Sequence, residues 1–218
     1  LNQLIINQKN SKLKSFLPGL TEELKFEEHK IFINYVKDKF NIKGNGKILL
    51  DNKSDSLSYQ IIKDNIKFYF DTKIKLKKNS LLIDFLEYEK KEGLNSLVSI
   101  KGNFKKNNQL RFDSIILKEE NNEISIKGLE LNKSFKIVNI ENFNINYKNN
   151  RNIINKINLK KNNSNFIIEG ESFDASRIIN NIMNSDEESQ TIFDNLNSKI
   201  NIRIDKTYID ETIYINNL

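Results

Sequence analysis

Hydrophobic and polar residues alternate along most of this chain, most regularly in residues 66–76. One side of the alternation carries lysine, tyrosine or aspartate, and the other carries Ile66, Phe68, Phe70, Ile74 and Leu76. Alternation of this kind predicts a β-strand with one dry face and one wet face. Five such side chains left in water would forfeit about 10 kcal/mol, comparable to the stability of a whole domain. We therefore expect something to cover the dry face.

Polar clusters recur at intervals of about 10 to 15 residues, which is the spacing of a strand plus a turn. The clusters lie at 51–55, 63–65, 77–80, 90–93, 105–109, 119–122, 148–152 and 160–165. The strands predicted beside or between them are 42–50, 66–76, 81–88, 94–104, 110–118, 123–131, 135–147, 153–159 and 166–169. No helical segment long enough for a crossover interrupts this series, so we expect an antiparallel meander over residues 42–171. In the first of these strands, Gly44 and Gly46 predict a bulge or a bend.

The two ends of the chain depart from this rhythm. Residues 1–41 are an irregular or mixed lead-in, in which 21–40 fits a strand running into a helical turn. Near the other end, Asp174 can cap a helix over 174–184 whose isoleucines form one apolar stripe. An acidic loop is expected at 185–195, and strands return over 196–218, where Ile200, Ile202 and Ile204 alternate with polar residues.

Composition indicates one continuous unit rather than two domains. The 218 residues include seven glycines, one proline and no cysteine, and no Gly-, Pro- or Ser-rich spacer divides them. No run of about 18 apolar residues is present, as a membrane-spanning helix would require. The chain begins with Leu1, so we expect it to be a segment cut from a longer protein.

The net charge of +6 raises the question of nucleic-acid binding. However, the lysines alternate with aspartate and glutamate or lie in turns, which is typical of a solvated outer face. RNA binding by strands would need aromatic residues on the same face as the lysines. Phe68 and Phe70 lie opposite the lysines of their strand, so no nucleic-acid partner is expected.

Residues with catalytic potential are few. The segment 170–174 reads G-E-S-F-D and is similar to a nucleophile elbow, but its second glycine is missing. Ser172 and Asp174 are instead expected to satisfy free N–H groups at the helix start. The single histidine, His29, is expected at the surface, and no cluster of histidines, cysteines or carboxylates has metal-ligand spacing. We therefore expect no enzyme activity, no cofactor and no metal.

Two arrangements would cover the dry faces. In a β-sandwich two sheets cover each other, giving a structural or protein-binding module. In a curled open sheet, the dry face lines a trough that holds an apolar ligand. The residues alone favour the sandwich as the simpler arrangement.

Three motifs resemble the AsmA-like superfamily of bacterial envelope proteins, most closely its YhdP-type branch. Leu86-x-Tyr88-x-Lys90-x-x-Gly93 is similar to the family's L-x-Y-x-K-x-x-G turn, and residues 170–176 are similar to its G-x-x-F-D-A-S segment. The repeated strand motif I-x-G is present at 42–44, 100–102 and 126–128. The resemblance covers roughly residues 42–208.

This resemblance implies an all-β fold, a long antiparallel meander curled into an open elongated groove with one short inserted helix. It further implies a periplasmic segment of a parent protein anchored in the inner membrane, which conducts phospholipid between the inner and outer membranes. Contact with the membranes would be made by other parts of the parent protein. The expected partners are phospholipid acyl chains, and the expected groove lining is Ile66, Phe68, Phe70, Ile74, Leu76, Ile200, Ile202 and Ile204.

Overall fold

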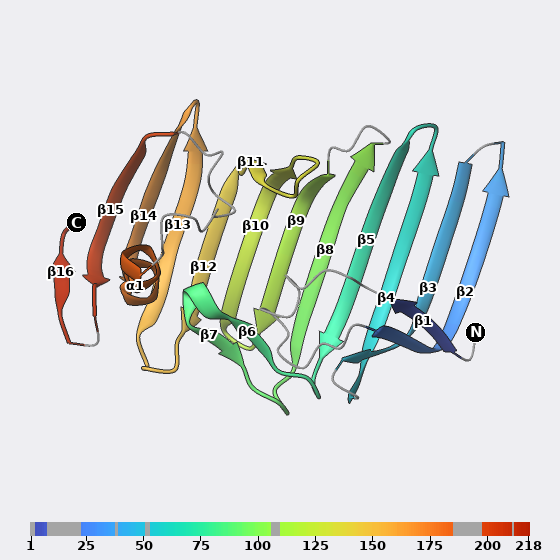
Figure 1. Ribbon diagram of the computed structural model, residues 1–218, viewed down its shortest axis with the longest axis horizontal. Coiled ribbons are helices and arrows are strands. Elements are labelled where there is room, and N and C mark those ends of the chain that lie inside the picture. The colour runs from blue at the N-terminus through green and yellow to red at the C-terminus, as the bar shows by residue number, and fades with distance from the viewer. Residues whose placement is uncertain are drawn as a thin grey trace.

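One large open sheet makes up most of the protein (Figure 1). The computed structural model describes residues 3–7, 23–37, 39–50, 53–105, 110–184, 198–210 and 212–218. The sheet has 14 strands, of which 13 follow one another side by side. In that order they are β1 (Gln3–Asn7), β2 (Glu23–Val36), β3 (Lys39–Leu50), β4 (Lys53–Asp64), β5 (Lys67–Leu76), β8 (Ser96–Lys105), β9 (Leu110–Glu119), β10 (Asn122–Leu131), β12 (Asn142–Lys148), β13 (Ile154–Asn162), β14 (Asn165–Asp174), β15 (Ile200–Tyr208) and β16 (Tyr214–Asn216). The remaining strand, β11 (Ile137–Asn139), pairs with β10.

Nearly all neighbouring strands are antiparallel, which confirms the predicted all-β meander. The exception is β14 with β15, a parallel pair. Between them the chain passes through α1 (Ser176–Asn184), the only α-helix in the described part of the chain. The predicted helix therefore exists. It forms part of the crossover connection between the parallel strands β14 and β15, whereas a meander joined only by hairpins would contain no crossover.

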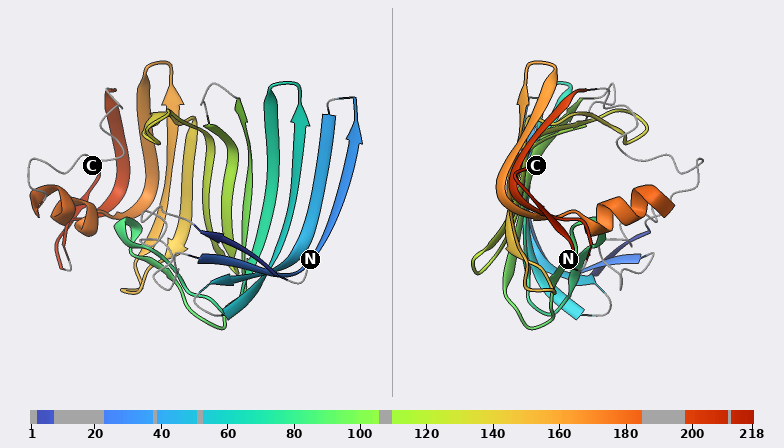
Figure 2. Two further views of the ribbon diagram at one scale, coloured as in Figure 1. Left: turned by 45° about the vertical axis from the view of Figure 1, so that its right-hand side comes forward. Right: turned by 90° about the vertical axis from the view of Figure 1, so that its left-hand side faces the viewer.

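The sheet is strongly curved. In the right-hand view of Figure 2 it has the outline of a C, with α1 on the open side. Register shifts interrupt the ladders at Lys101/Gly102 and at Lys156/Ile157. At the first shift, a Cβ on Gly102 would lie 2.3 Å from the carbonyl oxygen of Arg111, so only glycine allows this close backbone approach. Bulges of this kind bend a sheet and increase its twist.

A further bulge lies where Gly44 and Gly46 predicted one, but on the partner strand. The β2–β3 register shifts between Glu27 and Lys30, opposite Gly46. Glu28 has a φ of 53°, which places it in the left-handed region. Below this bulge β2 turns across the concave side together with β1 (Figure 2).

A small second unit covers part of the concave face. It comprises β6 (Leu81–Ile83), the 3₁₀ helix η2 (Asp84–Leu86) and β7 (Tyr88–Lys90). Together with the start of α1 we call it the cap. Leu86 and Tyr88 of the cap join sheet residues in the larger hydrophobic core, and Ile178 of α1 packs against the same cluster.

Several predicted boundaries were wrong. The strand expected within residues 21–40 is present, but the described residues of this range contain no helical turn: β2 runs to Val36, Lys37 has a φ of 42°, and β3 begins at Lys39. The lead-in over residues 1–41 is therefore partly sheet, whereas its residues 8–22 lie outside the described part of the chain. The strand expected over 81–88 is split by η2, since Glu87 has a φ of 50°. The strand expected over 135–147 is divided into β11 and β12.

The acidic loop expected over 185–195 lies outside the described residues, and strands do return after it as predicted. Asp174 remains in β14, and α1 begins at Ser176. The strands end at an upper and a lower edge of the sheet in Figure 1. The upper edge carries the β2–β3, β4–β5 and β13–β14 turns, and the lower edge carries the β3–β4, β9–β10 and β12–β13 turns.

Candidate functional site

The concave face carries apolar rows that cross the sheet from strand to strand. Residues opposite each other in a ladder point to the same face, so the register identifies each row. One row consists of Leu57, Ile74, Val98, Leu117, Ile124, Ile145, Ile157, Gly170 and Ile204. The cap lies over this row, and most of its side chains are buried. We call it the capped row.

Three further rows lie between the capped row and the upper edge, and we call them the open rows. The first consists of Tyr59, Thr72, Ile100, Ile115, Ile126, Phe143, Leu159, Ile168 and Ile202. The second includes Ile33, Ile42, Ile61, Phe70, Gly102, Phe112 and Leu129, and the third includes Tyr35, Phe40, Lys63, Phe68, Phe104, Leu110 and Leu131. Most of these side chains are half-buried or exposed. An apolar surface of this extent on a monomer usually marks a binding site.

Aromatic side chains form the upper part of this surface. The rings of Phe68 and Phe104 are stacked with centroids 4.6 Å apart, and Phe40 meets Phe68 edge-on at 6.0 Å. In the next row, Phe70 meets Phe112 edge-on at 5.8 Å. Phe70 has room because its neighbour is Gly102, whose absent Cβ would lie 2.6 Å from the Phe70 ring. The glycine of this I-x-G motif thus makes space for an aromatic ring on the concave face.

The cap is held by buried polar contacts. Tyr88 donates its hydroxyl hydrogen to Glu119 at 2.7 Å, and burial, followed by this hydrogen bond, raises the pKa of Tyr88. Lys90 is fully buried and donates to the carbonyl oxygens of Asn79 at 2.6 Å and Lys77 at 3.1 Å. Burial lowers the pKa of Lys90, although Asp55 works in the opposite direction. The alternate residues of the motif at 86–93 therefore anchor the cap.

Asp55 fixes the loop that leads into the cap. Its carboxylate accepts hydrogen bonds from the backbone N–H groups of Lys77, Lys78 and Asn79 and from the Asn79 side chain. Burial alone would raise the pKa of Asp55, but these hydrogen bonds together lower it. The lower side of the concave face is thus closed by a network whose hydrogen bonds are satisfied.

Arg151 pairs with Asp174 and with Glu87, one residue from each of two motifs of the resemblance. Asp174 also accepts hydrogen bonds from Asn149 at 2.8 Å, from the backbone N–H of Ser176 at 3.2 Å and from the Ser176 hydroxyl at 2.7 Å. The prediction that Asp174 satisfies an N–H group at the helix start is therefore confirmed. The same prediction for Ser172 was wrong, because Ser172 lies within β14 opposite Lys156 and Lys206.

The residues expected to line a groove divide into three groups. Phe68, Phe70, Ile200 and Ile202 lie on the concave face above the capped row. Ile74, Leu76 and Ile204 share that face but lie at the cap, where Leu76 and Ile204 are 3% and 4% exposed. Ile66 lies in the β4–β5 turn, outside the strand that was predicted to contain it, and is 65% exposed.

Sequence reasoning missed the central part of the surface, which consists of Ile100, Ile115, Ile126, Phe143, Leu159 and Ile168. Ile100, Ile126, Phe143 and Leu159 alternate with polar residues in the predicted strands, whereas Ile115 and Ile168 each have an apolar neighbour in the sequence. The alternation was thus a signal in four of the six strands, and the common face of all six residues follows only from the register.

His29 was predicted at the surface, and this was wrong. It is 4% exposed and lies at the β2 bulge, where the missing side chain of Gly46 leaves space for its ring. Its Nε2 donates to the carbonyl oxygen of Lys47 at 3.0 Å, and its ring lies against Phe26 and Tyr59. The bulge, which local sequence does not reveal, turns the imidazole inward.

The opposite, convex face is mostly polar, with a few apolar side chains such as Ile62 and Leu97, and it carries ion pairs between neighbouring strands. Lys101 pairs with Asp71 at 2.9 Å, and Arg111 pairs with Glu130 at 2.5 Å and Glu141 at 2.9 Å. These hydrogen bonds raise the pKa of Arg111. The predicted division into a dry and a wet face is therefore present across the sheet.

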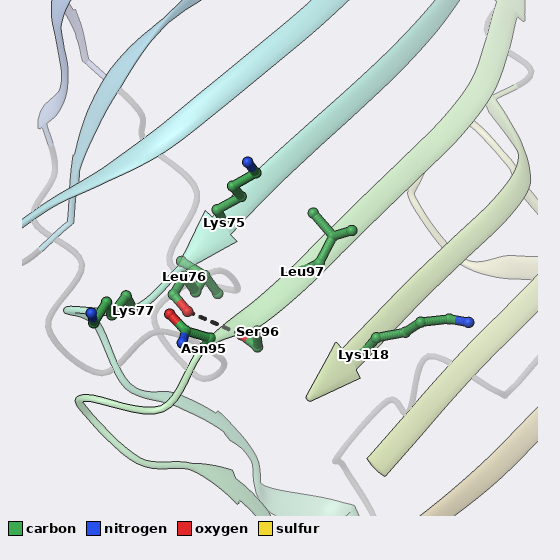
Figure 3. Close-up of a pocket in the computed structure, with 7 residues that line it drawn as sticks. All are labelled: Lys75, Leu76, Lys77, Asn95, Ser96, Leu97 and Lys118. Atoms are coloured by element: carbon green, nitrogen blue, oxygen red, sulfur yellow. Dashed lines mark hydrogen bonds between the residues drawn. The ribbon is translucent and has the colours of Figure 1, made fainter. Parts of the chain in front are cut away.

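A pocket of about 330 Å³ lies at the lower edge, between β5, β8 and β9 (Figure 3). Its lining is Lys75, Leu76, Lys77, Asn95, Ser96, Leu97 and Lys118. Leu97 lies between Lys75 and Lys118 in one cross-strand row of the convex face. The pocket is therefore separate from the open rows.

No group of three or more histidines, cysteines or carboxylates among the described residues could hold a metal ion. None of the helices in that part of the chain is long and apolar enough to cross a membrane. The described surface thus has an extended apolar concave face and a mostly polar convex face. No family model, no curated protein and no solved structure matches the chain.

Proposed function

We propose that this chain is a segment of a lipid-conducting groove in which phospholipid acyl chains lie on the open rows of the concave face. The observation that carries the proposal is the continuity of these rows. The row through Ile115 runs from Tyr59 on β4 to Ile202 on β15. Its apolar members lie half-buried or exposed, whereas the same strands present lysines and carboxylates on the convex face.

Acyl chains have the chemistry that this surface needs. Burial of one methylene contributes about 0.8 kcal/mol, so half of a ~16-carbon chain contributes roughly 6 kcal/mol. The cap cannot provide this cover, because it packs on the capped row. A groove of this kind fits an AsmA-like envelope protein that carries phospholipid across the periplasm. We propose that the chain is a segment of such a protein.

The alternative, a structural or protein-binding module, has one observation in its favour. Residues 30–36 of β2 pair with β3 on one side, but β1 reaches only to Glu27 on the other. Phe32, Ile33 and Tyr35 are 64%, 69% and 65% exposed. An open apolar edge can accept a strand from another protein. In its sandwich form, however, this alternative would need a second covering sheet, and among the described residues that sheet is only β6–β7.

Site-specific photocrosslinking tests the groove. Crosslinkers are placed at Phe70 and Ile115 on the concave face, and at their convex neighbours Asp71 and Ser114 as matched controls. The protein is incubated with phospholipid vesicles, and bound and crosslinked lipid is measured by mass spectrometry. We expect lipid adducts at Phe70 and Ile115 and few at Asp71 and Ser114. Adducts at the convex positions alone, or no bound lipid, would refute the proposal.

A further inference from the structure

The upper edge of the groove is basic. From β2 to β14, the strand ends and turns there carry Lys37, Lys39, Lys63, Lys67, Lys105, Lys133, Lys136, Lys160 and Lys161. Carboxylates lie at the same edge in ion pairs: Asp64 with Lys39 at 3.1 Å, and Glu130 and Glu141 with Arg111. We call this set of lysines the basic rim. Lysines clustered along one edge attract phosphate groups.

Two lysines of the basic rim point to the concave side. Lys63 belongs to the third open row, opposite Phe40 and Phe68, and its Nζ lies 5.8 Å from the centre of the Phe40 ring. Lys161 lies opposite Phe166, and its Nζ donates to the side-chain oxygen of Asn139 at 2.5 Å. Among the described residues neither ammonium group is paired with a carboxylate. Both charges therefore lie where an apolar surface ends, without a neutralising anion.

At the lower edge, several cations are held in ion pairs beside the cap. Lys53 pairs with Glu92 at 2.7 Å, and Lys118 pairs with Glu123 at 3.0 Å. Arg151 pairs with both Glu87 and Asp174 in the cap network. Lys63 and Lys161 thus lie on one side of the open rows, and a closed cap lies on the other.

This asymmetry orients any amphiphile on the open rows. A phosphate placed against the capped row would have to lose its water, and the Tyr88 hydroxyl and Lys90 ammonium of the cap already donate to Glu119 and to backbone carbonyl oxygens. At the basic rim the phosphate stays hydrated and meets ammonium groups. The acyl chains then extend from the rim across the open rows.

Resting on the function proposed above, we infer that the groove selects phospholipids with a net negative headgroup and holds their phosphates at Lys63 and Lys161. These two lysines lie on β4 and β13, six strand positions apart, which corresponds to about 29 Å at the usual spacing of strands. They therefore contact different lipid molecules along the rim. One lysine near an anionic headgroup strengthens its binding by about fivefold.

Lipid competition tests this inference. The full chain is incubated with vesicles of equal parts phosphatidylglycerol, which is anionic, and phosphatidylcholine, which is zwitterionic, and bound lipid is counted by native mass spectrometry. We expect about fivefold enrichment of phosphatidylglycerol at low salt. The enrichment shrinks as ionic strength rises, because salt screens exposed charges.

Two double variants distinguish the effect of the rim lysines on lipid selection from the effect of the protein's net charge. Lys63→Gln with Lys161→Gln should abolish the enrichment, because bound phosphatidylglycerol falls about fivefold, to the level of phosphatidylcholine. The matched control, Lys75→Gln with Lys148→Gln, removes the same charge from exposed positions near the lower edge and should keep the enrichment. Equal loss in both double variants, or no enrichment in the unmodified chain, overturns the inference while lipid binding itself stands. Absence of any bound lipid overturns the proposed function as well.

Discussion

A single carboxylate in the middle of the open rows should interrupt lipid binding. Ile115 lies at the centre of the first open row, between Ile100 on β8 and Ile126 on β10. In Ile115→Asp the charged group must keep its water, so an acyl chain crossing this position loses contact with about three methylenes. At about 0.8 kcal/mol each, the loss is roughly 2.4 kcal/mol, or about a 50-fold fall in affinity.

The assay is binding of a fluorescent phospholipid to the purified variants, with thermal unfolding measured in parallel. The control is Ser114→Asp, the same new side chain one residue earlier on the convex face. There it lies opposite Lys101 and Lys127 and should change affinity by less than about twofold. Ile202→Asp provides a second test at a side chain that is 44% exposed, where loss of fold is not expected. Unchanged affinity in folded Ile115→Asp and Ile202→Asp would refute the reasoning.

Three further predictions concern stability and association. Asp174→Ala should lower the free energy of unfolding by about 3 kcal/mol in urea titrations, because it leaves the buried partners of Asp174 unpaired. The control Ser172→Ala should lower it by less than about 0.5 kcal/mol. Equal effects would contradict the hydrogen-bond network around Asp174. Asp55 has a lowered pKa in the folded state, so its stabilisation is present above the unfolded pKa of about 3.9 and is lost as pH falls through the folded pKa. Asp55→Asn should therefore destabilise at neutral pH, and its deficit should shrink below about pH 4; a deficit independent of pH would argue against this contribution. Ile33→Lys should reduce concentration-dependent self-association in light scattering, since it charges the open β2 edge, and an unchanged mass would show that this edge does not associate.

The alternation of residue types determined the class of the fold. Strands such as 66–76 and 123–131 could be located because period-two alternation depends only on local side-chain order. The helix after residue 174 was found in the same way, from a polar residue followed by an apolar stripe. The dry face of each strand was equally local information, which is why Phe68, Phe70 and Ile202 could be named in advance.

Contacts between segments distant in sequence could not be read in this way. Nothing local shows that residues 81–90 fold back over the sheet, because their burial depends on partners such as Glu119 and Tyr147. His29 is buried only because a bulge on β2 meets Gly46 on β3.

The sequence by itself therefore determined that the chain forms strands with one apolar and one polar face. Only the tertiary structure decided that these faces join into one curved surface, with one row under the cap and the other rows open. The physical reason is that alternation is a property of each strand, whereas register, bulges and the placement of the cap are set by packing between strands. The basic rim belongs to the second kind of information, since its lysines come from separate turns that the ladders align along one edge.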